Sequence, residues 1–319
     1  MAALAAVAVS SACSHDTAPD PTQGKTHPAG TAAGKITFNS GHIGIAVGPD
    51  GVGYVTSSAG LDRFSTQSPY TILTSLTTGP GPRDVVIDRA GTTAYAATDN
   101  GKVYLVDLKT GAMKATLVVD TLYHSGDALF NHLAVAPDGS RAYLITDGAL
   151  ASLPTSGAAA TPSGHRGSSV AVSPTTGAIY LTNIDGDFFA ARLDPATFTV
   201  QATTSTRLYS SAVAVAPRGD EVYVGSSGGV LAFLDPATLA ERGRVTLGTY
   251  DGIVGIAVSP DGTQIYLVLS QARVAIVDRA TRTVLSTFTV GGYPLGIAFD
   301  PQGTTAFVVN LDSWVDVIR

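Results

Sequence analysis

Few side chains in this chain could do acid–base or metal chemistry, and two of them occupy matching positions. Asp84 and His132 each lie five residues before the reference residue of a repeated segment, Arg89 and Pro137 respectively. A carboxylate and an imidazole held close together can act as general base and acid, or share a divalent cation that activates water. Asp84 and His132 are therefore the candidate catalytic residues, for a reaction such as the opening of a lactone.

A second set of residues is suited to ligand binding. These are aromatic, charged, amide or imidazole side chains in or near the same loops: His42, Arg83, Tyr123, His124, Asn131, Arg166, Tyr209, Asp251 and Tyr293. Three of them belong to an insertion at 120–132. Polar and aromatic groups on an extra loop favour a small-molecule site. The alternative is an ordinary solvated insertion whose Leu122 and Phe130 cover the structure beneath it.

Several function classes lack support in the sequence. No phosphate-binding loop, Cys-x-x-Cys pair or haem-attachment motif occurs. The sequence requires no cofactor, and it leaves open whether Asp84 and His132 bind a divalent metal. His124 and His132 match no recognised zinc spacing. The net charge is -6 and only 14% of residues are charged. Because non-specific nucleic-acid binding depends on Lys and Arg neutralising phosphates, no nucleic-acid partner is expected.

The candidate residues are positioned by a segment that recurs seven times, of the form apolar-Ala-Val-x-Pro-Asp-Gly-x-x-x-Tyr. Its proline position is occupied by Pro49, Arg89, Pro137, Pro174, Pro217, Pro260 and Pro301, in steps of 40, 48, 37, 43, 43 and 41 residues. A near-constant period in the forties, filled with short strands and turns, is typical of a β-propeller with one blade per repeat. The sequence therefore predicts an all-β, seven-bladed β-propeller over residues 35–319, whose channel mouth carries the candidate residues.

Two further features of the repeat make structural predictions. The chain ends in a third strand, and the missing outer strand is found near the other end: Ile36–Asn39 is predicted to pair with Trp314–Ile318 and close the ring, which removes exposed sheet edges. An Asp-x-x-Thr corner recurs at 107–110, 194–197, 235–238 and 278–281. Its aspartate is expected to accept backbone N–H bonds within a tight turn, rather than to bind metal.

The repeat resembles the YVTN family of β-propeller repeats, a group that includes YncE-like and surface-layer-associated proteins. The resemblance rests on Gly53-Tyr-Val-Thr56, on Ile179-Tyr-Leu-Thr-Asn183 and on Val274-Ala-Ile-Val-Asp-Arg-Ala-Thr281, and it covers residues 35–319. It implies the propeller fold but no particular activity, because the shared residues are packing and turn residues. DNA binding, which the resemblance implies for some members, conflicts with the acidic charge.

The N-terminal residues predict export. Residues 1–12 form a signal-like leader with an apolar run and small residues before Cys13, the sole cysteine, and residues 13–34 form a polar, flexible tether. This pattern resembles a bacterial lipoprotein signal, in which the cysteine is lipidated; the alternative is a plain secretory signal. The expected location is the bacterial cell envelope, as a membrane-anchored lipoprotein or in the periplasm or outside the cell. The lipid anchor would be the only membrane contact.

Taken together, the sequence predicts an exported, lipid-anchored propeller that binds a protein, a glycan or a small molecule at the mouth of its central channel. The competing hypothesis is a lactonase-like hydrolase or lyase that uses Asp84 and His132. An enzyme requires these side chains to converge on one point within hydrogen-bonding or ligation distance.

Overall fold

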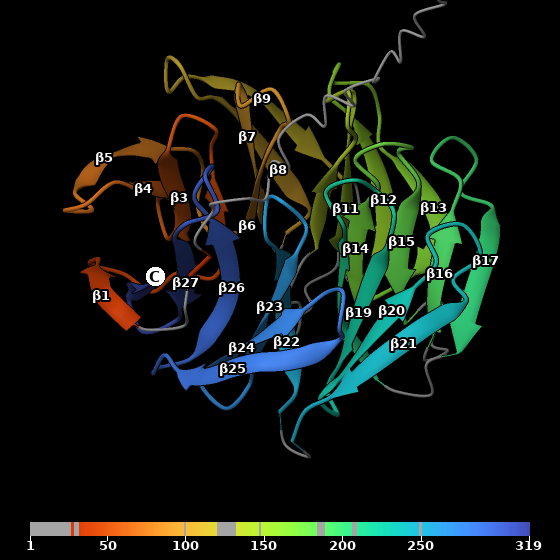
Figure 1. The fold of residues 1–319 in the computed structure, drawn as a ribbon. Coiled ribbons are helices and arrows are strands. Elements are labelled where there is room, and N and C mark those ends of the chain that lie inside the picture. The colour runs from red at the N-terminus through yellow and green to blue at the C-terminus, as the bar shows by residue number, and fades with distance from the viewer. Residues whose placement is uncertain are drawn as a thin grey trace, which may run out of the picture.

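The computed structural model describes residues 27–28, 32–98, 100–119, 132–146, 148–183, 189–205, 209–248 and 251–319. Within them the chain forms seven four-stranded antiparallel sheets. Each sheet's inner strand lies beside the inner strand of the next sheet, and the last of these inner strands lies beside the first. The sheets therefore form a closed ring (Figure 1), which confirms the predicted all-β, seven-bladed propeller. No helix in the described part of the chain is long and apolar enough to cross a membrane.

Each blade is numbered by its order in the chain, and its strands are given from the channel outward. Blade one contains β2 (Ile45–Val47), β3 (Val52–Ser57), β4 (Gly60–Ser65) and β5 (Ile72–Thr77), and blade two contains β6 (Pro82–Ile87), β7 (Thr93–Thr98), β8 (Lys102–Asp107) and β9 (Met113–Val118). Blade three contains β10 (Leu133–Val135), β11 (Arg141–Thr146), β12 (Ala149–Pro154) and β13 (Thr161–Arg166), and blade four contains β14 (Ser169–Val172), β15 (Ile179–Thr182), β16 (Phe189–Leu193) and β17 (Val200–Ser205). Blade five contains β18 (Ser210–Val215), β19 (Val222–Ser226), β20 (Val230–Leu234) and β21 (Glu241–Thr246), and blade six contains β22 (Ile253–Val258), β23 (Gln264–Leu269), β24 (Arg273–Asp278) and β25 (Thr283–Thr289). Blade seven contains β26 (Pro294–Phe299), β27 (Ala306–Asn310), β28 (Trp314–Ile318) and β1 (Ala32–Thr37).

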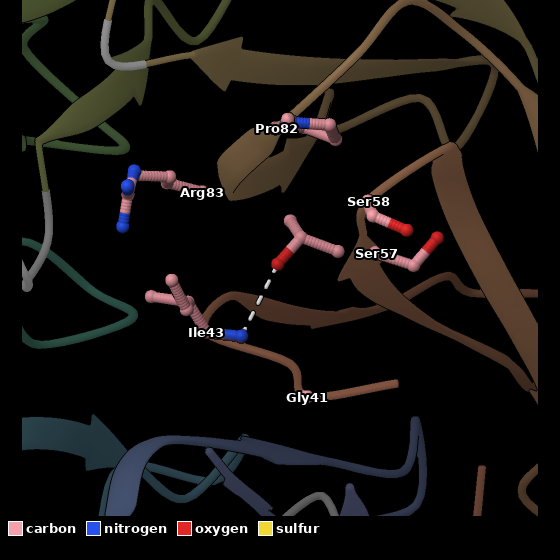
Figure 2. Close-up of a pocket in the computed structure, with 8 residues that line it drawn as sticks. Gly41, Ile43, Ser57, Ser58, Pro82 and Arg83 are labelled. Carbon is pink, nitrogen blue, oxygen red and sulfur yellow. Dashed lines mark hydrogen bonds between the residues drawn. The ribbon is translucent and has the colours of Figure 1, made fainter. Parts of the chain in front are cut away.

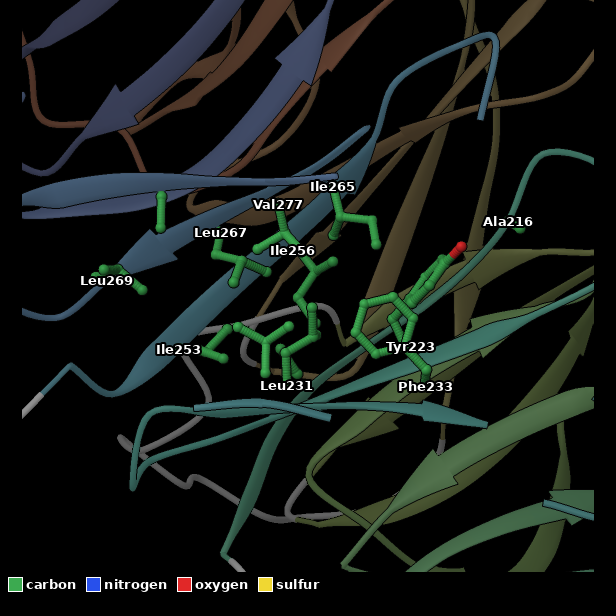
Figure 3. Packing of buried hydrophobic residues seen from close by; sticks show 13 residues of the cluster. Ala216, Tyr223, Leu231, Phe233, Ile253, Ile256, Ile265, Leu267, Leu269 and Val277 are labelled. Carbon is green, nitrogen blue, oxygen red and sulfur yellow. The ribbon is translucent and has the colours of Figure 1, made fainter. Parts of the chain in front are cut away.

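The hydrophobic core lies between neighbouring blades. The second and third strands are buried on both faces, which explains their apolar runs, whereas outer strands such as β17 alternate between exposed and partly buried residues. Between blades five and six, Tyr223 and Phe233 belong to the same buried cluster as Ile265 and Val277 (Figure 3). The tyrosine recurs at this position in most blades, so the repeat itself supplies one large side chain to each inter-blade layer.

The ring closes as the sequence predicts. β1 pairs antiparallel with β28, with Ile36 opposite Val315 and Thr37 opposite Trp314. The pairing begins at Ala32, ahead of the expected propeller start at residue 35. The first and last parts of the chain therefore share one sheet, and β1 supplies the outer strand of blade seven.

The connections divide the ring into two faces. One face, here called the mouth face, carries the loops from each outer strand to the next inner strand and the hairpins between second and third strands. The opposite face, the turn face, carries the Pro-Asp-Gly turns and the Asp-x-x-Thr corners. In these corners the aspartates accept backbone N–H bonds as predicted, with distances from Thr N to Asp Oδ1 of 2.8, 3.0, 2.8 and 2.7 Å for Thr110, Thr197, Thr238 and Thr281.

Candidate functional site

Asp84 fastens two blades together. It lies in β6, and its carboxylate accepts hydrogen bonds from the backbone N–H groups of Val85 (2.8 Å), His132 (3.0 Å) and Leu133 (3.1 Å). Burial raises the pKa of this carboxyl to about 6, although the three N–H donors act in the opposite direction. Two of these donors belong to the segment that enters β10, so the side chain bonds blade two to blade three across the mouth of the channel.

His132, whose backbone N–H donates to Asp84, lines a different cavity from Asp84. Burial lowers the pKa of the imidazole to about 4, so the ring is neutral at pH 7. His132 lines a pocket of about 330 Å³ on the mouth face, whereas Asp84 lines the central channel.

Six of the ten residues that line the pocket beside His132 carry hydroxyl groups, and these six belong to blades four to six. The lining residues are His132, Ser168, Tyr209, Ser210, Ser211, Ser227, Gly252, Ile253, Val254 and Ser270. Tyr209 is 60% exposed, so its ring is available at the surface. None of these lining residues carries a formal charge at neutral pH, because the one titratable imidazole is held neutral.

Asn183 fixes the serine-rich wall of this pocket. It follows β15 and adopts a left-handed backbone conformation with a φ of 51°. Its Nδ2 donates to Ser168 Oγ (2.8 Å) and to the Ser210 carbonyl oxygen (2.6 Å), while its Oδ1 accepts from Ser210 N–H (3.2 Å). One amide side chain therefore holds two lining segments, from blades four and five, in a fixed relationship.

A second cavity, of about 220 Å³, opens on the same face between blades one and two. Figure 2 shows Ile43 and Arg83 on one side of it and Ser57 and Ser58 on the other. Thr56 Oγ1 accepts hydrogen bonds from Ile43 N–H (3.2 Å) and Gly44 N–H (3.0 Å), which positions the loop that enters β2. Arg83 is thus the one predicted ligand-binding residue placed in this cavity.

The central channel itself is largely apolar. Its cavity of about 310 Å³ is lined by the inner strands, with Ile45, Val85, Leu133, Val170, Val213 and Ile256 among the contributors. Asp84 is the charged residue among those lining it. Because its oxygens are used by three backbone N–H groups, the channel offers little polar chemistry to a ligand.

Two of the predicted ligand contacts lie below the surface instead. His42 is fully buried, packs edge-on against Phe38 at 4.6 Å between ring centroids, and bonds through Nδ1 to the Thr56 carbonyl oxygen. Burial lowers its pKa, more than the Thr56 contact and nearby Asp62 raise it. Asp251 is 5% exposed and forms an ion pair with Arg273. Both side chains stabilise mouth-face loops and do not present a binding surface.

The remaining predicted contacts fall into two groups. Tyr209 lines the hydroxyl pocket, Tyr293 is 57% exposed in the connection between β25 and β26, and Arg166 is exposed at the end of β13. Tyr123, His124, Asn131 and Cys13 lie outside the described residues. The insertion therefore remains a prediction from the sequence.

Sequence reasoning did not single out Ser227 and Ser270, which the hairpins between second and third strands bring into the pocket. The repeat contained a signal for them: each lies four residues after the blade tyrosine (Tyr223 and Tyr266), as Ser58 follows Tyr54. The described residues include no group of three or more His, Cys, Asp or Glu side chains arranged to hold a metal ion.

Comparison with known proteins adds to the fold and not to the activity. No protein-family model and no curated protein matches the chain, so the resemblance to YVTN repeats rests on the quoted residues. A solved structure, Kuenenia stuttgartiensis hydrazine synthase, superimposes with a TM-score of 0.72 at 16% sequence identity, covering 89% of this chain and 97% of that one. Likeness at this identity establishes a shared β-propeller fold.

Proposed function

We propose that this propeller is a binding protein whose ligand occupies the hydroxyl-lined pocket on the mouth face. The ligand class that fits is an uncharged, hydroxyl-bearing molecule, such as a saccharide or a glycan end. Serine hydroxyls both donate and accept hydrogen bonds, and an exposed aromatic ring such as Tyr209 provides an apolar face against which a sugar ring can pack.

The observation that carries this proposal is the combination of a neutral His132 with a lining that, among the described residues, bears hydroxyl groups and no formal charge. A pocket for a phosphate or carboxylate ligand would require Arg, Lys or a cluster of backbone N–H groups, because a buried anion needs charged or hydrogen-bonding partners. A neutral polyol makes no such demand. The overall charge of -6 further disfavours a nucleic-acid partner.

The geometry favours binding over catalysis. The lactonase-like alternative requires Asp84 and His132 to act on one substrate, but Asp84 faces the channel and His132 faces the pocket. Both carboxylate oxygens of Asp84 also accept hydrogen bonds from backbone N–H groups. A substrate screen with lactones is the direct test of the alternative, and turnover lost on Asp84→Asn would support it.

The experiment that tests the binding proposal is a glycan array followed by calorimetry with the saccharides that bind. Tyr209→Ala should weaken binding about threefold to tenfold, as expected for the loss of one aromatic contact. Tyr293→Ala is the matched control, because Tyr293 is equally exposed (57% against 60%) and lies on blade seven. Equal effects of the two substitutions, or an absence of saccharide binding, would contradict the proposal.

We further propose that the protein is exported and tethered through Cys13. The tether residues His27 and Pro28 contact Asp261 and Tyr266 on the turn face. A lipid anchor preceding them would leave the mouth-face pocket on the side away from the anchor. Mass spectrometry of the mature protein should find a lipidated Cys13 at its N-terminus; an unmodified cysteine, or a cleavage site elsewhere, would overturn this part.

A further inference from the structure

The tether residues His27 and Pro28 occupy a small site on the turn face of blade six. Tyr266 Oη donates a hydrogen bond to the Pro28 carbonyl oxygen at 3.0 Å. The His27 ring nitrogen Nε2 lies 2.9 Å from Asp261 Oδ2 and 2.9 Å from Thr263 Oγ1. Pro28 is buried there. A two-residue imidazole–proline segment is therefore recognised by an aspartate, a hydroxyl and a tyrosine of one blade.

These three groups are part of the repeat, and blade three carries all of them. The residues that correspond to Asp261, Thr263 and Tyr266 are Asp138, Ser140 and Tyr143.

The two turns are also built alike. Thr263 donates through N–H (3.0 Å) and Oγ1 (3.0 Å) to Asp261 Oδ1, and Ser140 donates through N–H (3.0 Å) and Oγ (2.8 Å) to Asp138 Oδ1. In each turn the second oxygen, Oδ2, is left for another partner. In blade six the His27 ring lies beside this oxygen, at ion-pairing distance.

In blade three the same groups line a groove of about 460 Å³. Asp138, Ser140 and Tyr143 lie along blade three, and the opposite side is formed by Thr175, Thr176 and Pro195 of blade four. The groove thus lies over the part of blade three that corresponds to the His27–Pro28 site of blade six.

The blade tyrosines differ in whether their hydroxyl groups have a hydrogen-bond acceptor. Tyr180 donates to the Pro236 carbonyl oxygen (2.8 Å), and Tyr266 donates to the Pro28 carbonyl oxygen (3.0 Å). Tyr95 and Tyr223 also have acceptors, in the Gly139 carbonyl and the Glu221 carboxylate. Tyr143 is 1% exposed, and within the described part of the chain its hydroxyl has no hydrogen-bond partner. Because Tyr143 lines the groove, a carbonyl oxygen from outside can supply the acceptor that these other tyrosines find within the protein.

We propose that the groove between blades three and four binds an extended segment of a partner protein in which a histidine, lysine or arginine precedes a proline. The prolyl carbonyl accepts the Tyr143 hydroxyl, and the preceding side chain donates to Asp138 Oδ2. Proline suits this site because its fixed φ lowers the entropy lost on binding. This interaction is independent of the mouth-face pocket, which lies on the opposite face of the ring.

The test uses a blocked peptide with the sequence of residues 24–30, Gly-Lys-Thr-His-Pro-Ala-Gly, titrated into the full chain by NMR or calorimetry. Tyr143→Phe removes only the hydroxyl and should weaken binding about fivefold, and Asp138→Asn should weaken it by a similar factor. Tyr266→Phe is the matched control on blade six and should leave the affinity unchanged. A peptide with alanine in place of proline should bind less tightly to the unaltered protein.

Three results would overturn the proposal. One is an affinity that depends on Tyr266 and not on Tyr143, because the peptide would then merely replace the tether at blade six. Another is the absence of binding to a folded protein. The third is a crystal structure in which the Tyr143 hydroxyl bonds to the Pro195 carbonyl, as Tyr180 bonds to Pro236, because the groove would then be closed. Circular dichroism of each variant separates a loss of binding from a loss of folding.

Discussion

The Asp84 carboxylate accepts its hydrogen bond from the backbone N–H of His132, at 3.0 Å, and not from the imidazole ring. The two residues that looked most like a catalytic pair are therefore joined through the main chain. The bond holds the start of blade three against blade two, and His132 itself lines the hydroxyl pocket. This relationship gives Asp84 a structural role, with consequences for stability.

Asp84→Asn should change how stability depends on pH. Burial raises the folded-state pKa of Asp84 from an ordinary value of 3.8 to about 6. A carboxyl with a raised folded pKa binds its proton more tightly in the folded state, so its stabilising contribution is complete below about pH 4 and is lost as pH rises to about 6. Two pKa units correspond to about 3 kcal/mol. The free energy of unfolding of the wild type minus that of Asp84→Asn should fall by about this amount between pH 4 and pH 6 in urea titrations.

Removal of β1 should destabilise the whole ring and not only its own blade. β1 contributes a ladder of hydrogen bonds to β28 and the buried side chain of Ile36, together about 5 kcal/mol. A chain that starts at residue 38 should therefore melt about 10 °C or more below a chain that starts at residue 32, as measured by calorimetry. Similar melting temperatures would show that the ring does not depend on this closure.

The architecture follows from the sequence because the repeat encodes local geometry. Pro-Asp-Gly turns, Asp-x-x-Thr corners and apolar strands are defined by neighbours along the chain, and the match between the segments before Ile45 and Ile297 was enough to predict the closing pair. The repeat does not predict how deeply a particular loop side chain is buried. His42 and Tyr209 both lie in mouth-face loops, yet one is fully buried and the other is 60% exposed.

What separates these two residues is packing between blades, which the repeat does not record. Phe38 lies against His42, whereas Tyr209 lines the pocket and is mostly exposed. For the same reason the sequence does not reveal the partners of Asp84 in the next blade. These partners are backbone N–H groups, and every residue except proline has one. Ser227 and Ser270 were recoverable, because they recur at one offset from the blade tyrosine.

Replacing Asn183 by alanine and by glycine should separate its two roles. Both substitutions remove the hydrogen bonds that tie Ser168 to Ser210, at a cost of about 1–3 kcal/mol. Alanine should cost about 1 kcal/mol more than glycine, because the φ of 51° is unfavourable for a residue with a β-carbon. Chemical unfolding measures the difference.

The same two variants also probe the pocket. Both variants lack the Asn183 hydrogen bonds that hold Ser168 and Ser210 together. Saccharide affinity should therefore fall equally in the glycine and alanine variants. An affinity that follows stability, lower in alanine than in glycine, would mean that Asn183 acts only on the fold.

His132→Gln should reveal a pH dependence opposite to that of Asp84→Asn. Burial lowers the folded-state pKa of His132 from an ordinary 6.5 to about 4. The unfolded chain therefore binds the proton more readily between these values, so this residue's contribution is complete above about pH 6.5 and is lost as pH falls to about 4. The free energy of unfolding of the wild type minus that of His132→Gln should rise by about 3 kcal/mol across this range.

In the wild type the contributions of Asp84 and His132 to the pH dependence of stability have opposite signs between pH 4 and pH 6. A variant that lacks one of these residues should therefore show the contribution of the other. In the difference between the unfolding free energies of each variant and the wild type, the contributions of all other titrating groups cancel. The double variant should lose both contributions. An NMR titration supplies the independent check: the His132 ring resonances should stay constant down to about pH 5 and shift only below it. A ring that titrates near pH 6.5 would mean that His132 is solvated, and the uncharged pocket on which the saccharide proposal rests would carry a cation under mildly acidic conditions.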